Sequence, residues 1–237
     1  QQVSIARLDR TGNIDPRRRD TVACDRLGLC FSFLASSELA RQAGARSRWS
    51  AADGGWLITH DSWMTSSLPG LYVAGETTGV AGADAAMQEG RLAGLGVALA
   101  LGRVTPEATA ATAAPLRRKL RSINRFAGLL KQLSCPDEKL LMNLLTEDTT
   151  LCKCEEITLR EFNACLDENP YYSSANAVKL NLRTGMGLCQ GRYCNHYVSR
   201  LLTARRGVAA EDSGAFTPRF PAKPVRIGDL LTPGKDG

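Results

Sequence analysis

LCKCEE at residues 151–156 and GMGLCQGRYC at residues 185–194 carry four of the eight cysteines of this 237-residue chain. Four thiolates on two short loops are the ligand set of a [2Fe–2S] cluster or of a tetrahedral zinc ion. The C-x-C spacing is tighter than the usual spacing of structural zinc sites, so it favours iron. The glycines of the second segment also favour iron, because they let backbone N–H groups approach the sulfurs. His196 lies just two residues past the last cysteine, which is not a ligand-like spacing.

The same two segments resemble the [2Fe–2S] domain of bacterioferritin-associated ferredoxins, in which C-x-C-E-E precedes one helix and G-M-G-x-C-Q-G-R-x-C precedes another. The resemblance covers residues 151–202. It implies that all four cysteines are cluster ligands, namely Cys152, Cys154, Cys189 and Cys194. A zinc knuckle, or a set of buried thiols or disulfides, is the alternative that cysteine spacing alone leaves open.

A second segment, LYVAGE at residues 71–76, is typical of a buried strand that ends in a glycine and an acid. A loop of small residues (77–84) follows, and then a helix over residues 83–101 that Gly102 closes. A carboxylate at the end of a strand can accept a hydrogen bond from a ribityl hydroxyl, and a helix N-terminus favours negative charge. This order therefore suits a flavin, and an ordinary α/β crossover with a glycine-rich turn is the alternative.

The pattern L-Y-V-A-G-[DE]-x-x-G, followed by A-A-x-x-E-G-R-x-A-G, resembles the C-terminal FAD-binding segment of the two-dinucleotide-domain flavoproteins. The resemblance implies a Rossmann-like α/β fold, with FAD contacts at Gly75, Glu76, Gly82 and Ala83. The usual acid in that family is Asp, so Glu76 is one methylene longer. No G-x-G-x-x-G for the FAD pyrophosphate follows a strand in this sequence. We therefore expect the C-terminal half of an FAD domain: either the sequence is a fragment, which we favour, or a separate chain supplies the first half.

The bulk properties of the chain are those of an ordinary globular protein with a modest charge of +6. Part of that charge comes from one cluster of basic residues: Arg117, Arg118, Lys119, Arg121, Arg125 and Lys131. The cluster lacks the aromatic interleaving of a nucleic-acid surface. We interpret it as a solvated helix face, with an acidic partner surface as the alternative.

The sequence contains no run of 18 apolar residues and no recognisable signal peptide at its start, so we expect no membrane span. The cysteines then indicate reduced or metal-bound thiols in a cytoplasm rather than a secreted disulfide framework. Peripheral association with the inner membrane is compatible with this interpretation.

The chain is expected to divide into four parts: the C-terminal half of an FAD-binding domain (1–103), a helical linker (104–150), the [2Fe–2S] domain (151–202) and an extended, proline-rich tail (203–237). The elements expected within them are strands at residues 2–9, 21–24, 27–31 and 56–59, a turn at 11–13, and helices at 38–43, 105–134, 138–145, 158–166, 174–185 and 190–202. Four further cysteines are expected to be structural: Cys24, Cys30, Cys135 and Cys165.

The combination of an FAD half-domain with a [2Fe–2S] domain resembles the α-type subunits of heteromeric bacterial dehydrogenases of amino acids and amines. Opine oxidase, proline or hydroxyproline dehydrogenase, sarcosine-oxidase-like enzymes and hydrogen cyanide synthase belong to this class. The resemblance implies an electron-transfer subunit with two kinds of partner, a second FAD-containing catalytic subunit plus a small ferredoxin-like subunit. The segment GETTG (75–79) favours the cyanide synthase type, which oxidises glycine to hydrogen cyanide and CO2.

No catalytic residue is evident in this chain. Two other functions are kept as alternatives. One is a zinc-bearing, non-catalytic assembly scaffold, and the other is an NAD(P)H-dependent flavoprotein reductase.

Overall fold

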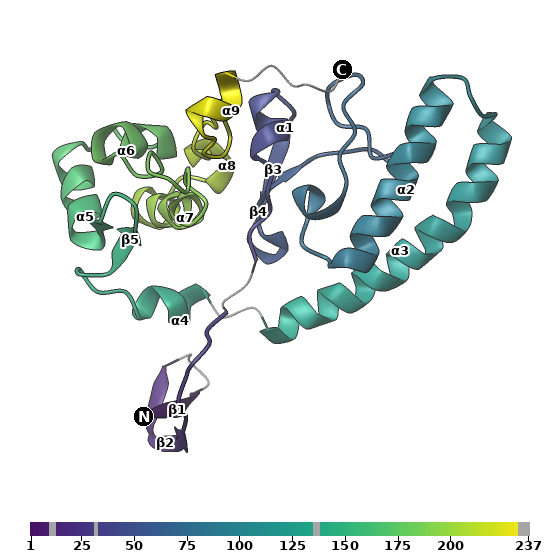
Figure 1. Ribbon diagram of the computed structural model, residues 1–237. Helices are drawn as coiled ribbons and strands as arrows, with labels where there is room; N and C mark the ends of the chain where they lie inside the picture. Colours follow the sequence, from purple (N-terminus) through teal and green to yellow (C-terminus); the bar gives the residue numbers. More distant parts are fainter. Residues whose placement is uncertain (10–12, 31–32, 135–137, 232–237) are drawn as a thin grey trace.

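A computed structural model describes residues 1–9, 13–30, 33–134 and 138–231 of the chain. Figure 1 shows an N-terminal hairpin that projects from the rest of the molecule, a pair of long helices on one side, and a bundle of short helices on the other. Short strands and one short helix lie between the two helical regions. The fold is mixed helix and sheet, as predicted. The strand pairings found among the described residues are all antiparallel, rather than those of a parallel Rossmann-type sheet.

The projecting hairpin consists of β1 (Gln2–Leu8) and β2 (Ile14–Ala23), in a register that pairs Gln2 with Ala23. The hairpin confirms the strand predicted at residues 2–9, whereas the predicted turn at 11–13 lies mostly outside the described residues. The prediction of buried strands at 21–24 and 27–31 is wrong: Val22 is exposed within β2, and residues 24–30 form no strand. A two-stranded hairpin has no second layer to cover it, so its apolar residues stay in water.

The cysteines of this region follow the same pattern. Cys30 is exposed and Cys24 is half-buried, so the expectation of two core thiols is wrong for Cys30. Cys165 is buried, as predicted. Cys135 lies outside the described residues.

The middle of the chain forms α1 (Glu38–Gln42), β3 (Ser47–Ser50), η1 (Ala51–Asp53), β4 (Gly55–Ile58) and η2 (Gly75–Thr78). The strand predicted at residues 56–59 is confirmed as β4, and all four of its residues are buried. Its partner strand β3 was not predicted. The cross-strand rings of Trp49 and Trp56 meet edge to face, with 5.4 Å between their centroids. This contact covers one face of the hairpin.

The prediction of a buried strand at residues 71–76 is wrong. Tyr72 makes a single antiparallel bridge with Thr65, and the chain then turns into η2 at Gly75. Gly75 has a φ of +80°, which is outside the range of an extended strand and is readily adopted by glycine. The segment therefore forms a turn in front of the next helix.

Two long helices follow, α2 (Ala83–Ala100) and α3 (Pro106–Ser134), and they pack against each other (Figure 1). Their shared core contains Met64, Leu92 and Ala113. Gly96 allows the close approach of a loop, because a Cβ there would lie 2.8 Å from the carbonyl oxygen of Trp63. The predicted helix and its closure at Gly102, which has a φ of +63°, are confirmed.

The basic cluster lies on α3 but does not form one solvated face. Arg117 lies over the ring of Trp63, with 4.2 Å between the guanidinium carbon and the ring centroid. Lys131 makes a 2.6 Å ion pair with Asp53 of η1. The remaining four basic residues are exposed, as predicted: Arg118, Lys119, Arg121 and Arg125.

The last region contains α4 (Glu138–Asn143), β5 (Thr150–Cys152), β6 (Ile157–Thr158), α5 (Leu159–Glu168), α6 (Ala175–Leu182), α7 (Cys194–Arg206), α8 (Ala210–Ser213) and α9 (Ile227–Leu231). Thr158 and Glu161 form the predicted capping box at the start of α5, and Ser174 caps α6. The helix expected from residue 190 starts later, at Cys194. Gln190 and Gly191 have φ values of +53° and +83°, which a right-handed helix excludes.

The tail contains α8 and α9 instead of staying wholly extended, and it folds back onto this region. Phe216 is buried against Gly185 and Gly191, where an added Cβ would lie 2.5 Å and 2.8 Å from its ring. The guanidinium of Arg41 donates a 2.7 Å hydrogen bond to the carbonyl oxygen of Phe216. The tail therefore connects α1 to the cysteine-bearing domain.

None of the described helices has both the length and the apolar character needed to cross a membrane.

Candidate cofactor sites

The four cysteines of the two quoted segments lie in two adjacent pairs. The thiols of Cys152, at the end of β5, and Cys194, the first residue of α7, are within hydrogen-bonding reach of each other. The thiol of Cys154 is within reach of Cys189 in the same way. Each pair joins one cysteine from each segment, so the fold brings together residues separated by 35 to 42 positions in the sequence.

Backbone N–H groups surround the sulfur of Cys189. Burial alone would raise the pKa of this thiol, but hydrogen bonds from the Tyr193 N–H, the Cys154 thiol and the N–H groups of Gly191 and Arg192 lower it. The positive φ values of Gln190 and Gly191 turn these N–H groups toward the sulfur, which explains the glycine in this loop. A lowered pKa favours the thiolate, which is the form that binds a metal.

The environment of Cys194 disfavours its thiolate, in contrast to that of Cys189. Cys194 is almost completely buried, and that burial, followed by the neighbouring Cys152 and Cys189, raises its pKa. Several thiolates so close together repel one another when no cation lies between them. A positively charged centre is the group that would allow all of them to ionise.

Gly187 permits the close packing of the two segments. A Cβ at this position would lie 2.3 Å from the Cβ of Cys154 and 3.4 Å from its sulfur. The backbone of Gly187 does not have a positive φ, so this close approach, rather than backbone strain, requires glycine. An ion pair at 3.0 Å between Arg183, at the end of α6, and Glu155 lies close to the same contact.

The four thiols are arranged as two pairs. In the described ranges, no three His, Cys, Asp or Glu side chains converge as they would around a single metal ion. In a [2Fe–2S] cluster each iron takes two protein ligands, and the bridging sulfides complete its coordination. Two adjacent thiol pairs therefore fit the ligand set of such a cluster.

The residues predicted to contact FAD lie where η2 meets α2. Glu76 is exposed on η2, while Gly82 and Ala83 are exposed at the start of α2. Gly82 has a φ of +87°, makes no side-chain cap for the helix, and has nothing within 4 Å of the position of a Cβ. The start of this long helix is therefore open to an anionic or hydrogen-bond-accepting group.

Glu89 is a candidate residue that the sequence analysis missed. Its buried carboxylate accepts a 2.7 Å hydrogen bond from the backbone N–H of Gly75 and a 2.8 Å hydrogen bond from the hydroxyl of Thr78. Glu89 thus ties α2 to both ends of η2. Its helical spacing from Ala85 and Leu92, which are also buried, is the signal that could have identified it.

Comparison with known proteins gives no match to a family model. The chain is 37% identical over 195 residues to an opine oxidase subunit of Rhizobium meliloti, a match that covers 82% of this chain and 36% of that protein. It is 30% identical over 224 residues to hydrogen cyanide synthase subunit HcnB of Pseudomonas protegens, covering 94% of this chain and 46% of that protein. The chain is a homologue of these subunits.

Subunits of opine oxidase and hydrogen cyanide synthase are the class that the sequence resembled, so that prediction is confirmed. The chain spans less than half the length of these relatives. The crystal structure of L-proline dehydrogenase from P. horikoshii superimposes with a TM-score of 0.64 at 23% identity, over 84% of this chain and 37% of that one. This likeness supports a mixed helix-and-sheet fold.

Proposed function

We propose that this homologue of the opine oxidase and hydrogen cyanide synthase subunits is the electron-transfer component of a multi-subunit flavoprotein dehydrogenase for an amino acid or amine. The observation that carries the proposal is the pairing of Cys152 with Cys194 and of Cys154 with Cys189. All four would bind one [2Fe–2S] cluster. When bound, such a cluster supplies one-electron transfer, while the protein sets its position and potential.

The residues around the thiols have separate roles in this proposal. Cys152 and Cys194 form the buried side of the site, and Cys154 and Cys189 form the more accessible side. The N–H groups that surround Cys189 would raise the reduction potential, because hydrogen bonds to sulfur stabilise the more negative, reduced state. Phe216 covers the glycines of the same loop and limits the access of water.

The flavin half of the proposal uses Gly75, Glu76, Gly82 and Ala83 as part of an FAD site. The exposed start of α2 supports it, because Gly82 and Ala83 are exposed there and no side chain caps the helix. The pyrophosphate-binding part would come from a further segment or a separate chain. FAD would then serve as the two-electron partner of the one-electron cluster.

The substrate and partners are inferred from the names of the relatives. Glycine is our first choice, because its oxidation to hydrogen cyanide and CO2 releases four electrons and four protons that a flavin and iron–sulfur chain can carry. Opines, proline and hydroxyproline are the other candidates. A second FAD-containing subunit would remove hydride from the C–N bond, and a small ferredoxin-like subunit is a further partner.

The deciding experiment is metal and sulfide analysis of the full-length protein, purified anaerobically with its partners. We expect about two irons and two acid-labile sulfides per chain, with visible charge-transfer absorption that bleaches on reduction. A colourless protein with one zinc per chain would instead support the zinc-bearing scaffold and contradict electron transfer through this site.

The two acids near η2 should respond differently to substitution. Glu76→Ala should lower FAD retention with little change in the free energy of unfolding, because its side chain is exposed.

Glu89→Ala should destabilise the protein by about 1–3 kcal/mol, because it leaves the Gly75 N–H and the Thr78 hydroxyl without their buried acceptor. Flavin stoichiometry and chemical denaturation measure the two effects.

The control for both substitutions is Glu168→Ala, which removes an exposed acid from the end of α5. It should change neither flavin content nor stability appreciably. Unchanged flavin stoichiometry in the Glu76 variant would remove Glu76 from the site.

A further inference from the structure

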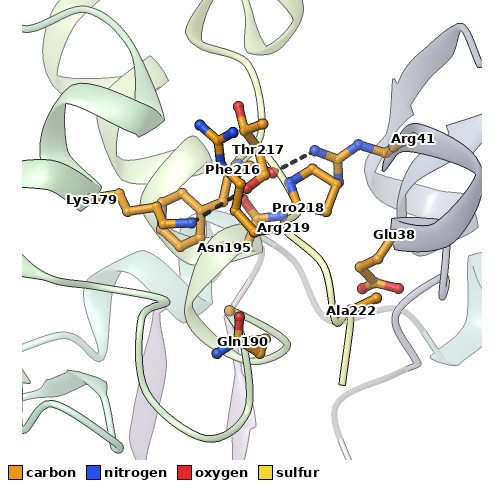
Figure 2. A pocket seen from close by; sticks show the side chains of 11 residues that line it. Glu38, Arg41, Lys179, Gln190, Asn195, Phe216, Thr217, Pro218, Arg219 and Ala222 are labelled. Atoms are coloured by element: carbon orange, nitrogen blue, oxygen red, sulfur yellow. Dashed lines mark hydrogen bonds between the residues drawn. The ribbon is translucent and has the colours of Figure 1, made fainter. Parts of the chain in front are cut away.

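Basic side chains from three separate elements meet at one cleft, at the junction of α1, α6 and the tail. Arg41 belongs to α1, Lys179 to α6 and Arg219 to the tail segment after Phe216. Figure 2 shows Arg41 and Lys179 approaching this tail segment from opposite sides, with Gln190 of the cysteine-bearing loop nearby. The cleft adjoins the thiol pairs, because Gln190 and Gly191 follow Cys189 and Asn195 follows Cys194, but none of the four cysteines lines it.

The positive charge of this cleft is not balanced by carboxylates. Glu38 is the acidic residue among its lining side chains, and its carboxylate accepts a 3.1 Å hydrogen bond from the hydroxyl of Ser36. Among the ion pairs found in the described part of the chain, none includes Arg41, Lys179 or Arg219. Three cations thus share one nearby acid.

The hydrogen bonds of the cleft go to neutral groups. Arg41 donates to the carbonyl oxygen of Phe216 at 2.7 Å, and Lys179 donates to that of Thr217 at 3.4 Å. A guanidinium has five N–H donors and an ammonium has three, so donors remain on both side chains. Burial, and then the neighbouring Arg219, lowers the pKa of Lys179, while the nearby Cys194 acts in the opposite direction.

We propose that this cleft binds the oxyanion head group of a small molecule, either a phosphate or a carboxylate. The guanidinium groups match the geometry of such oxygens, and the ammonium adds a point charge. The space between the lining side chains is about 20 Å³, which is room for about one water molecule. The head group would therefore lie at the open mouth of the cleft, and the rest of a larger ligand would extend into solvent. Gln190 and Asn195 add polar side chains to the lining.

Binding there would have a structural consequence. The anion would bridge α1, the cysteine-bearing domain and the tail, and it would offset the repulsion between Lys179 and Arg219. The segment from Phe216 to Arg219 would then be held more firmly over Gly185 and Gly191. Anion binding is therefore expected to stabilise the folded protein, whether or not the cysteines bind a cluster.

The test is thermal unfolding of the full-length protein in inorganic phosphate or sodium acetate, against sodium chloride at matched ionic strength. The expected result is a rise in melting temperature of about 2–5 °C that saturates with phosphate, acetate or both. Saturation with phosphate alone identifies a phosphate head group, and saturation with acetate alone identifies a carboxylate. No rise above the chloride series in either salt overturns the proposal.

Matched variants locate the effect. Arg219→Gln removes an exposed arm of the cleft and should fold normally, and Lys179→Met removes the ammonium. Both should abolish most of the anion-dependent shift, whereas the control Arg125→Gln, on the exposed face of α3, should retain it. An equal shift in Arg219→Gln and the parent protein would place the anion elsewhere and overturn the proposal.

Discussion

Cys189→Ser should reduce the bound iron and the visible absorption of the protein by more than about tenfold, while the flavin content of the complex changes little. The N–H groups of Tyr193, Gly191 and Arg192 and the Cys154 thiol lower the pKa of Cys189 against the effect of burial, so its thiolate form is favoured. A serine hydroxyl is a far weaker ligand for iron because it does not ionise near neutral pH. Iron and sulfide analysis with a visible spectrum measures the result.

The matched control is Cys24→Ser, which alters a half-buried free thiol near the N-terminal hairpin. Its iron content should equal that of the parent protein. If the Cys189 variant kept as much iron as the Cys24 variant, Cys189 would not be a ligand, and the electron-transfer proposal would lose its main support.

Gly187→Ala should have the second-largest effect, although it changes neither a charge nor a ligand. The new Cβ would lie 2.3 Å from the Cβ of Cys154, and neither atom belongs to the end of a flexible side chain. One of the two loops must move, which costs about 1–3 kcal/mol in a packed site. The movement would separate Cys154 from Cys189, so we expect lower iron occupancy and faster loss of iron to a chelator.

Gly90→Ala is the appropriate comparison. Gly90 lies in α2, and nothing lies within 4 Å of an added Cβ there. Alanine is a better helix former than glycine, so this variant should be as stable as the parent or more stable, by up to about 1 kcal/mol. Equal iron retention by the two glycine variants would show that the loops tolerate the extra methyl group and that the Gly187 contact is unimportant.

Sequence reasoning succeeded where the signal was local. The capping box at Thr158 and the cap at Ser174 placed the starts of α5 and α6, because a cap satisfies backbone N–H groups within the next turn. The helix from residue 83 to its closing glycine was also predicted correctly. The spacing of the cysteines suggested two partner loops, and the fold brings those loops together in thiol pairs.

Sequence reasoning failed where an apolar run was taken for a buried strand. Leu27 and Leu29 resemble strand residues in composition, but they are exposed in a segment with no strand. Strand propensity describes how a residue fits a half-buried surface, and no such surface covers this segment in the structure. Residues 71–76 failed for a different reason, because Gly75 turns the chain into η2 before a strand can pair.

The sequence alone thus indicated α2 to α6, the four candidate ligands and the relationship to the opine oxidase and hydrogen cyanide synthase subunits. Each of these depends on residues close together in the chain or on motifs with a set spacing. Only the tertiary structure decided which cysteines pair, that Glu89 supports η2, and that Phe216 packs between Gly185 and Gly191. These contacts join positions that are far apart or face one another only after packing, so no local pattern encodes them.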